Sequence, residues 1–294
     1  MNLKNLLAYL NERFPVVNMA LFAILFLTVF SVAGAGTPGP GFGAREAVGV
    51  LATISFFFRL RVFDEIKDYA LDARHHPQRV LQSGRVSLRQ LRGLAAVGAG
   101  LEAAWSAYLG GPVLVGWLLV VGYSLLMRYE FFVGRWLQPR LVLYAVSHML
   151  IMPLLIGWLW RAYSPDFGTG SPVYTLGLLS LLGGFSFELA RKIHAPAAEK
   201  DGIASYSKSL GFGGAIGAVL LVLLAGTLVQ GYLLRQLHAA AWPFALLAAL
   251  YLLTLLVYGL SWRRPHEKRL KAGELLVSLF MLSSYLSLII TLNF

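Results

Sequence analysis

The chain lacks cysteine and carries little charge. None of its 294 residues is a cysteine, so it cannot form a disulfide, a zinc–thiolate site or an iron–sulfur cluster, and it has no thiol nucleophile. Only 13% of the residues are charged, whereas a soluble domain has about 25%. With 57% apolar residues and a mean hydropathy of +0.67, this composition indicates a protein that is solvated by lipid.

Nine apolar runs are long enough to cross a membrane, which takes about 20 residues. We predict an all-α membrane protein with nine transmembrane helices in a single bundle and one domain over residues 1–294. Residues 3–12 are predicted to form a short amphipathic helix in the membrane interface. The runs lie at roughly 15–34, 43–63, 92–109, 112–128, 140–160, 172–191, 211–234, 240–262 and 273–293.

The 25 basic residues outnumber the 14 acidic ones, which gives a net charge of +11. If the nine runs cross the membrane in turn, every basic residue except Arg45, Arg161 and Arg235 falls on the same side. Loops rich in Lys and Arg face the cytoplasm, so we predict a cytoplasmic N-terminus and an outer C-terminus in a bacterial or archaeal-type cell membrane. Topology and anionic lipid explain the basic excess, so we predict no nucleic-acid partner and no obligate protein partner.

Acidic residues are concentrated directly after the second apolar run. Asp64, Asp68 and Asp72 are spaced by four and share one helical face, with Glu65 on its flank. Like charges at this spacing repel, so we expect a cation to neutralise them. Mg²⁺ suits this role, because it binds one or two carboxylates and takes its other ligands from water and phosphate oxygens. The alternative is a solvated helix end with pairs such as Asp64–Lys67 or Asp68–Lys67.

An arginine loop and a second polar stretch complete the candidate site. Arg79 follows the carboxylates, and arginine binds phosphate oxygens in a two-pronged geometry. We call Asp64, Glu65, Asp68, Asp72 and Arg79 the first island. The second island follows the sixth run and comprises Glu188, Lys192, Glu199, Lys200 and Asp201. Both islands follow even-numbered runs, so both are predicted to face the cytoplasm, where they would hold a diphosphate through metal ions.

At these residues the sequence resembles the UbiA superfamily of intramembrane prenyltransferases. The first motif of that family is approximately N-D-x-x-D-x-x-x-D followed by R-P-L-x-S-G. The chain has Asp64-Glu65-x-x-Asp68-x-x-x-Asp72 and then Arg79-Val-Leu-Gln-Ser-Gly84. The second motif, approximately D-x-x-x-D-x-x-x-D, is replaced by Glu188, Lys192 and Pro196. The resemblance covers nearly the whole chain.

The resemblance implies a Mg²⁺-dependent enzyme that ionises a prenyl diphosphate and transfers the prenyl group to an aromatic or lipid acceptor. It implies catalytic roles for Asp68, Asp72, Arg128 and Lys192. The implied diphosphate ligands are Arg79, Arg128, Lys192 and Lys200. The implied metal ligands are Asp64, Glu65, Asp68, Asp72, Glu188, Glu199 and Asp201.

Several alternatives stay open at this point. Arg128 is either a diphosphate ligand or an ordinary positive anchor at the end of the fourth run, and Lys192 either replaces part of a metal or only pairs with Glu188. Glu102 and His148 lie within apolar runs, where ionisable residues are costly and often functional. The alternatives for them are a pair with each other, a role in joining helices, and a contact with the substrate. Two other activities compete with prenyl transfer: terpene cyclisation, and non-catalytic binding or transport of a lipid or a divalent cation.

Overall fold

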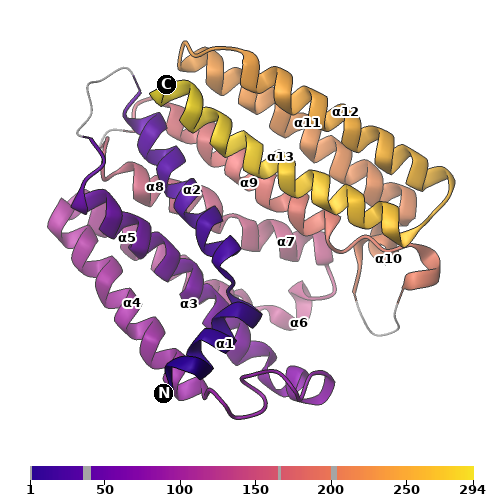
Figure 1. Ribbon diagram of the computed structural model, residues 1–294, viewed down its shortest axis with the longest axis horizontal. Helices are drawn as coiled ribbons and strands as arrows, with labels where there is room; N and C mark the ends of the chain where they lie inside the picture. The colour runs from indigo at the N-terminus through magenta and orange to yellow at the C-terminus, as the bar shows by residue number, and fades with distance from the viewer. Residues whose placement is uncertain (1, 36–40, 165–166, 200–203) are drawn as a thin grey trace. The chain divides into compact units, whose positions relative to one another are not determined.

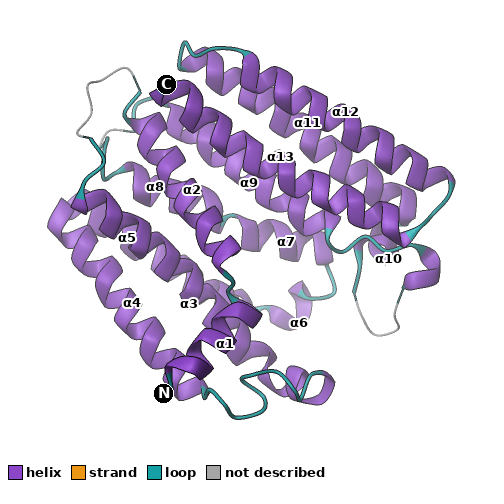
Figure 2. Cartoon of the chain, viewed as in Figure 1, coloured by secondary structure: helices purple, strands orange, loops and turns teal. Residues whose placement is uncertain are grey.

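The computed structural model describes residues 2–35, 41–164, 167–199 and 204–294. Helices make up most of this part of the chain, which contains no β-strand (Figure 2). The helices are α1 (Leu3–Arg13), α2 (Val16–Ala33), α3 (Ala44–His75), α4 (Leu88–Leu109), α5 (Gly111–Arg128), α6 (Gly134–Leu137), α7 (Leu141–Met149), α8 (Ile151–Trp160), α9 (Pro172–Ala190), α10 (Tyr206–Leu210), α11 (Phe212–Gln236), α12 (Trp242–Arg263) and α13 (Glu267–Asn293). Two 3₁₀ turns, η1 (Glu130–Phe132) and η2 (Pro196–Ala198), lie between them.

Each predicted apolar run falls on a helix or, for 140–160, on the pair α7 and α8. That pair is divided because Pro153 has no N–H to donate to the carbonyl four residues earlier, at Met149. Seven helical segments in the described ranges are long and apolar enough to cross a membrane, with Leu141–Trp160 counted as one. The segments α3 and α4 do not meet this criterion, because charged side chains interrupt them. The chain is an integral membrane protein, and the count of nine crossings stays a prediction.

The helix ends follow local rules. α3 continues past its apolar run to His75 and stops where Pro77 restricts the backbone of the residue before it. α4 begins with a reciprocal cap between Ser87 and Gln90. The turn into α5 places Gly110 at a φ of 114°, a conformation that favours glycine.

Two compact units make up the fold, and each is described by itself. The first contains residues 1–27 and 38–131, and the second contains 28–37 and 132–294. In the first unit α3 packs along α4 and α5 (Figure 1). Its core joins Tyr9 and Phe14 of the α1 region to Phe58 of α3 and to Leu81 and Val86 of the loop after α3. This shared core fixes the loop that carries Arg79.

The second unit is organised around α9. This helix packs against α7, α8, α11 and α13, while α12 packs against α11 and α13 (Figure 1). Tyr258 of α12 is fully buried against Gly273, where an added Cβ would come within 2.7 Å of its ring. A glycine therefore sets the close approach of α12 and α13.

Candidate functional site

The first island lies on the last three turns of α3, on the part of the helix that extends beyond its apolar run. Asp64 is exposed, Glu65 is buried, and Asp68 and Asp72 are half-buried. The predicted helix is therefore confirmed for all four carboxylates. Their surroundings differ, and the difference separates their possible roles.

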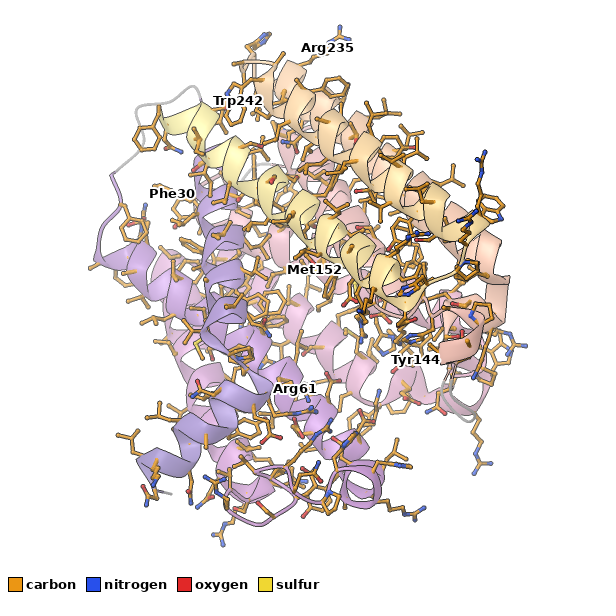
Figure 3. The ribbon with its side chains drawn as sticks, turned by 45° about the vertical axis from the view of Figure 1, so that its right-hand side comes forward. Phe30, Arg61, Tyr144, Met152, Arg235 and Trp242 are labelled. Atoms are coloured by element: carbon orange, nitrogen blue, oxygen red, sulfur yellow. The ribbon has the colours of Figure 1, made fainter. Side chains whose placement is uncertain are left out.

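Glu65 is held by two arginines. Its Oε1 lies 2.7 Å from Nε of Arg13 and 2.7 Å from Nη2 of Arg61, and its side chain is only 1% exposed. Figure 3 labels Arg61 on α3. Burial raises the pKa of Glu65, and the hydrogen bond and charge of Arg13 oppose that rise. This carboxylate already has the cations that neutralise it.

Asp72 is held by the loop and by the end of α1. Its Oδ2 accepts from Nη1 of Arg79 at 2.7 Å and from Nη2 of Arg13 at 3.5 Å. Glu12 accepts the backbone N–H of Val80 at 3.0 Å, which ties α1 to the same loop. Glu12 and Arg13 were not predicted to be parts of the site. The available indication was an acid next to a base at the end of an amphipathic helix.

Asp68 differs from both neighbours. In the described part of the chain its carboxylate has no hydrogen bond and no ion pair, although it is half-buried. Among the described residues no ion pair joins Asp68 to Lys67, and Nζ of Lys67 lies 3.4 Å from Oε1 of Glu130. Burial raises the pKa of Asp68, Lys67 lowers it in part, and Asp72 and Glu65 add to the rise. Asp68 is thus a carboxylate without a neutralising contact.

Arg128 ends α5 in the same unit. Its guanidinium lies 5.1 Å from the ring centre of Phe63 on α3 and 5.3 Å from that of Tyr129. Within the described ranges no carboxylate pairs with it. A cation stacked on aromatic rings keeps its N–H groups available for an anion.

The fit of this site to a metal ion depends on Asp68 and Asp72. Among the described residues no three His, Asp or Glu side chains lie close enough together to hold an ion. Mg²⁺ commonly uses only one or two carboxylates and takes its remaining ligands from water and phosphate. The uncompensated Asp68 and the second oxygen of Asp72 fit that smaller requirement.

The second island lies at the end of α9. Glu188 is paired with Nζ of Lys192 at 2.7 Å and with the guanidinium of Arg191. Glu199 accepts from Oγ of Ser205 at 2.7 Å and lies 3.7 Å from Nζ of Lys208. The alternative in which Lys192 pairs with Glu188 is therefore observed. The other two predicted residues, Lys200 and Asp201, lie outside the described residues.

Of the alternatives for Glu102, the one in which it joins helices is observed. Oε2 of Glu102 lies 2.7 Å from Nη2 of Arg59 and accepts from the indole of Trp117, while Oε1 accepts from Ser55. His148 stacks on Tyr144 of α7, which Figure 3 labels, and its Nδ1 lies 2.8 Å from the Tyr144 carbonyl. The reason is helical register: Arg59 faces α4 at the height of Glu102, so the buried acid and base satisfy each other.

The family model of the UbiA prenyltransferase family matches residues 17–284. A digeranylgeranylglyceryl phosphate synthase structure superposes with a TM-score of 0.69 at 16% identity and covers 99% of both chains. The apo structure of a UbiA homologue from Aeropyrum pernix K1 gives 0.67 at 18% identity, with 92% of this chain and 96% of that chain covered.

A UbiA homologue from Archaeoglobus fulgidus bound to GPP and Mg²⁺ gives a TM-score of 0.57 at 14% identity and covers 97% of this chain and 100% of that chain. No curated protein sequence matches the chain. At these identities the solved structures establish the fold, and the family model extends over most of the chain. The chain is a member of the UbiA prenyltransferase family.

Proposed function

We propose that the chain is a Mg²⁺-dependent enzyme that ionises a prenyl diphosphate in the membrane and transfers the prenyl group to a hydrophobic acceptor. The observation that carries the proposal is Asp68, a half-buried carboxylate without a neutralising contact, next to Asp72 in a family of prenyltransferases. The Archaeoglobus fulgidus homologue, which binds GPP and Mg²⁺, supports the choice of donor and metal.

Asp68 and Asp72 are the proposed metal ligands. When bound, Mg²⁺ supplies positive charge that stabilises the departing diphosphate. Asp64, Glu188, Glu199 and Asp201 stay predicted ligands. Glu65 stays one as well, but it would have to release Arg13 and Arg61 first.

The proposed diphosphate ligands are Arg79 and Arg128, with Lys192 and Lys200 as further predicted contacts. Arg79 is held 2.7 Å from Asp72, so a phosphate group there meets an arginine whose orientation is already fixed. Arg128 brings a charge that no carboxylate of the described chain neutralises. In the reaction the carbon–oxygen bond to the diphosphate breaks, both electrons leave with the diphosphate, and these cations stabilise the charge that develops on it.

The cation transport alternative has less support. It needs an acid in the membrane that is free to bind and release an ion, and Glu102 was its candidate. Glu102 is fully buried and accepts from Arg59, Trp117 and Ser55. A carboxylate with three donors is a structural connection between α3, α4 and α5.

The test is release of diphosphate from a panel of prenyl diphosphates of increasing chain length by the purified protein, with Mg²⁺ and with EDTA. The proposal expects release that requires Mg²⁺ from at least one donor. No release from any donor would refute it. Mass spectrometry of the products without an added acceptor separates transfer from cyclisation, because a cyclase forms a cyclic terpene from the donor alone, whereas a transferase without acceptor gives at most the linear prenyl alcohol or diene.

A further inference from the structure

A histidine and a glutamate meet beyond the second island. His194 follows the end of α9, and Glu267 is the first residue of α13. Nδ1 of His194 lies 3.1 Å from Oε1 of Glu267. Both residues belong to the second unit, and neither is part of the predicted metal or diphosphate site.

The surrounding backbone holds this pair in place. The other oxygen of Glu267 accepts the N–H of Ala195 at 3.0 Å, and the N–H of His194 donates to Oγ of Ser207 at 2.8 Å. The carboxylate therefore accepts a hydrogen bond from Nδ1–H of the imidazole and fixes its tautomer. In the described structure Nε2 has no partner, and the His194 side chain is 28% exposed.

This arrangement has the geometry of an oriented base. A histidine whose Nδ1–H donates to a carboxylate presents the lone pair of Nε2 in one direction, and the carboxylate stabilises the imidazolium that forms when Nε2 takes a proton. A histidine that only joins two segments needs no accessible second nitrogen. His194 also follows Lys192 of the second island by two residues in the sequence.

The proposed function requires a proton acceptor. When a prenyl cation is attacked by a hydroxyl oxygen, a carbon–oxygen bond forms and the oxygen must lose its proton. When it is attacked by an aromatic carbon, a carbon–carbon bond forms and the ring must lose a proton to become aromatic again. The electron pair of the broken bond has already left with the diphosphate, so one proton is released for each transfer.

We propose that Nε2 of His194 accepts this proton, with Glu267 as the residue that positions and stabilises it. The proton then passes from the imidazolium to water at the exposed edge of the ring. The inference rests on the proposed function and adds the residue that completes the transfer. It implies an acceptor that can lose a proton to an imidazole once the new bond has formed, namely an alcohol or an electron-rich aromatic ring.

The test separates a base from a structural connection by the choice of substitution. In His194→Asn the amide nitrogen occupies about the place of Nδ1, so the hydrogen bond to Glu267 is kept while the base is removed. The matched control is His238→Asn, because His238 lies between α11 and α12 at a φ of 50°, a conformation that asparagine tolerates. Two rates are measured for each protein: diphosphate release without acceptor, and formation of the coupled product.

We expect His194→Asn to lower coupled product by about 100-fold or more, in the range of general-base catalysis, while diphosphate release stays within about twofold. Glu267→Gln should lower coupling less, and added imidazole should restore coupling in His194→Ala.

Three results would overturn the inference. Equal losses of release and coupling would show a structural role. Unchanged coupling in His194→Asn would show that another group takes the proton. Absence of diphosphate release in the wild-type protein would refute the proposed function itself, and with it the need for a base.

Discussion

The two acidic islands begin from a similar pattern and reach opposite electrostatic states. In the second island Glu188 is neutralised locally by Arg191 and Lys192, three and four residues along the same chain segment. In the first island Arg61 pairs with Glu65 from the same helix, whereas Arg13 comes from α1 and Arg79 from the loop after α3. They satisfy Glu65 and Asp72 but leave Asp68 without a contact.

The comparison shows that the number of carboxylates does not define a metal site. A carboxylate whose two oxygens both bind cations, as in Glu188, must lose a cation before it binds another, whereas an uncompensated half-buried carboxylate gains from binding one. We therefore place the metal-dependent chemistry at the first island. In the second island Lys192 stays a predicted diphosphate ligand, and the chain then leads into the segment that carries His194.

The largest expected effect is on turnover. Asp68→Asn removes the uncompensated charge and keeps the side-chain shape, so diphosphate release should fall by more than about 100-fold, because metal charge stabilisation is worth several kcal/mol. Release is measured at saturating Mg²⁺ in detergent or nanodiscs. The matched control is Glu274→Gln, which removes the partner of Lys271 away from both islands. Full activity of Asp68→Asn would remove the foundation of the proposed function.

The next largest effect is expected on stability, from a substitution at Glu65, one turn before Asp68 on α3. Glu65→Gln leaves Arg13 and Arg61 without their shared acceptor charge, so the free energy of unfolding should fall by roughly 1–3 kcal/mol. Asp68→Asn should not lower it, since the substitution relieves repulsion. Thermal unfolding of the two variants in the same detergent measures the contrast. A greater loss of stability in Asp68→Asn would reverse the assignment of the two residues.

A third effect is expected on the pH dependence of the free energy of unfolding, measured on the protein without bound metal. Because burial raises the pKa of Asp68, the folded protein binds more protons there than the unfolded chain, and stability falls as pH rises through that pKa. Asparagine has no such dependence. Asp68→Asn should therefore be more stable than wild type at neutral pH, and the difference should shrink as the pH is lowered. Unfolding temperatures in EDTA across acid to neutral pH test this, and a difference that grows toward acid pH would contradict it.

The smallest effect is expected in the second island. Lys192→Gln leaves Arg191 paired with Glu188, so the free energy of unfolding should change by less than about 0.5 kcal/mol. The KM for the prenyl diphosphate should rise if Lys192 also contacts the donor, and Lys208→Gln serves as the control because that lysine lies by Glu199. A KM unchanged in Lys192→Gln would assign this lysine to Glu188 alone.

The features that were predictable from the sequence are local ones. Hydropathy located the helices, spacing by four put Asp64, Asp68 and Asp72 on one helix, and the same spacing offered the Glu188–Lys192 pair. The division of one predicted run into α7 and α8 was also predictable, because Pro153 lies within that run.

Contacts between distant segments were not predictable. Arg13 and Glu65 are 52 residues apart, and Arg59 and Glu102 are 43 residues apart. Each pair depends on how two helices are aligned when they pack. The hydropathy of a single segment does not predict that alignment. For the same reason the sequence showed which carboxylates were present, and only the structure separated the paired Glu65 from the uncompensated Asp68.

The most direct test of the account is binding of Mn²⁺, which takes the same oxygen ligands as Mg²⁺ and is detected by electron paramagnetic resonance. The measurement compares wild type, Asp68→Asn and Glu188→Gln without substrate and with a non-hydrolysable prenyl diphosphate analogue. The account predicts that Asp68→Asn raises the Kd for Mn²⁺ at least about tenfold more than Glu188→Gln does, as expected for loss of a ligand rather than of a paired charge. An equal or greater loss in Glu188→Gln would contradict it.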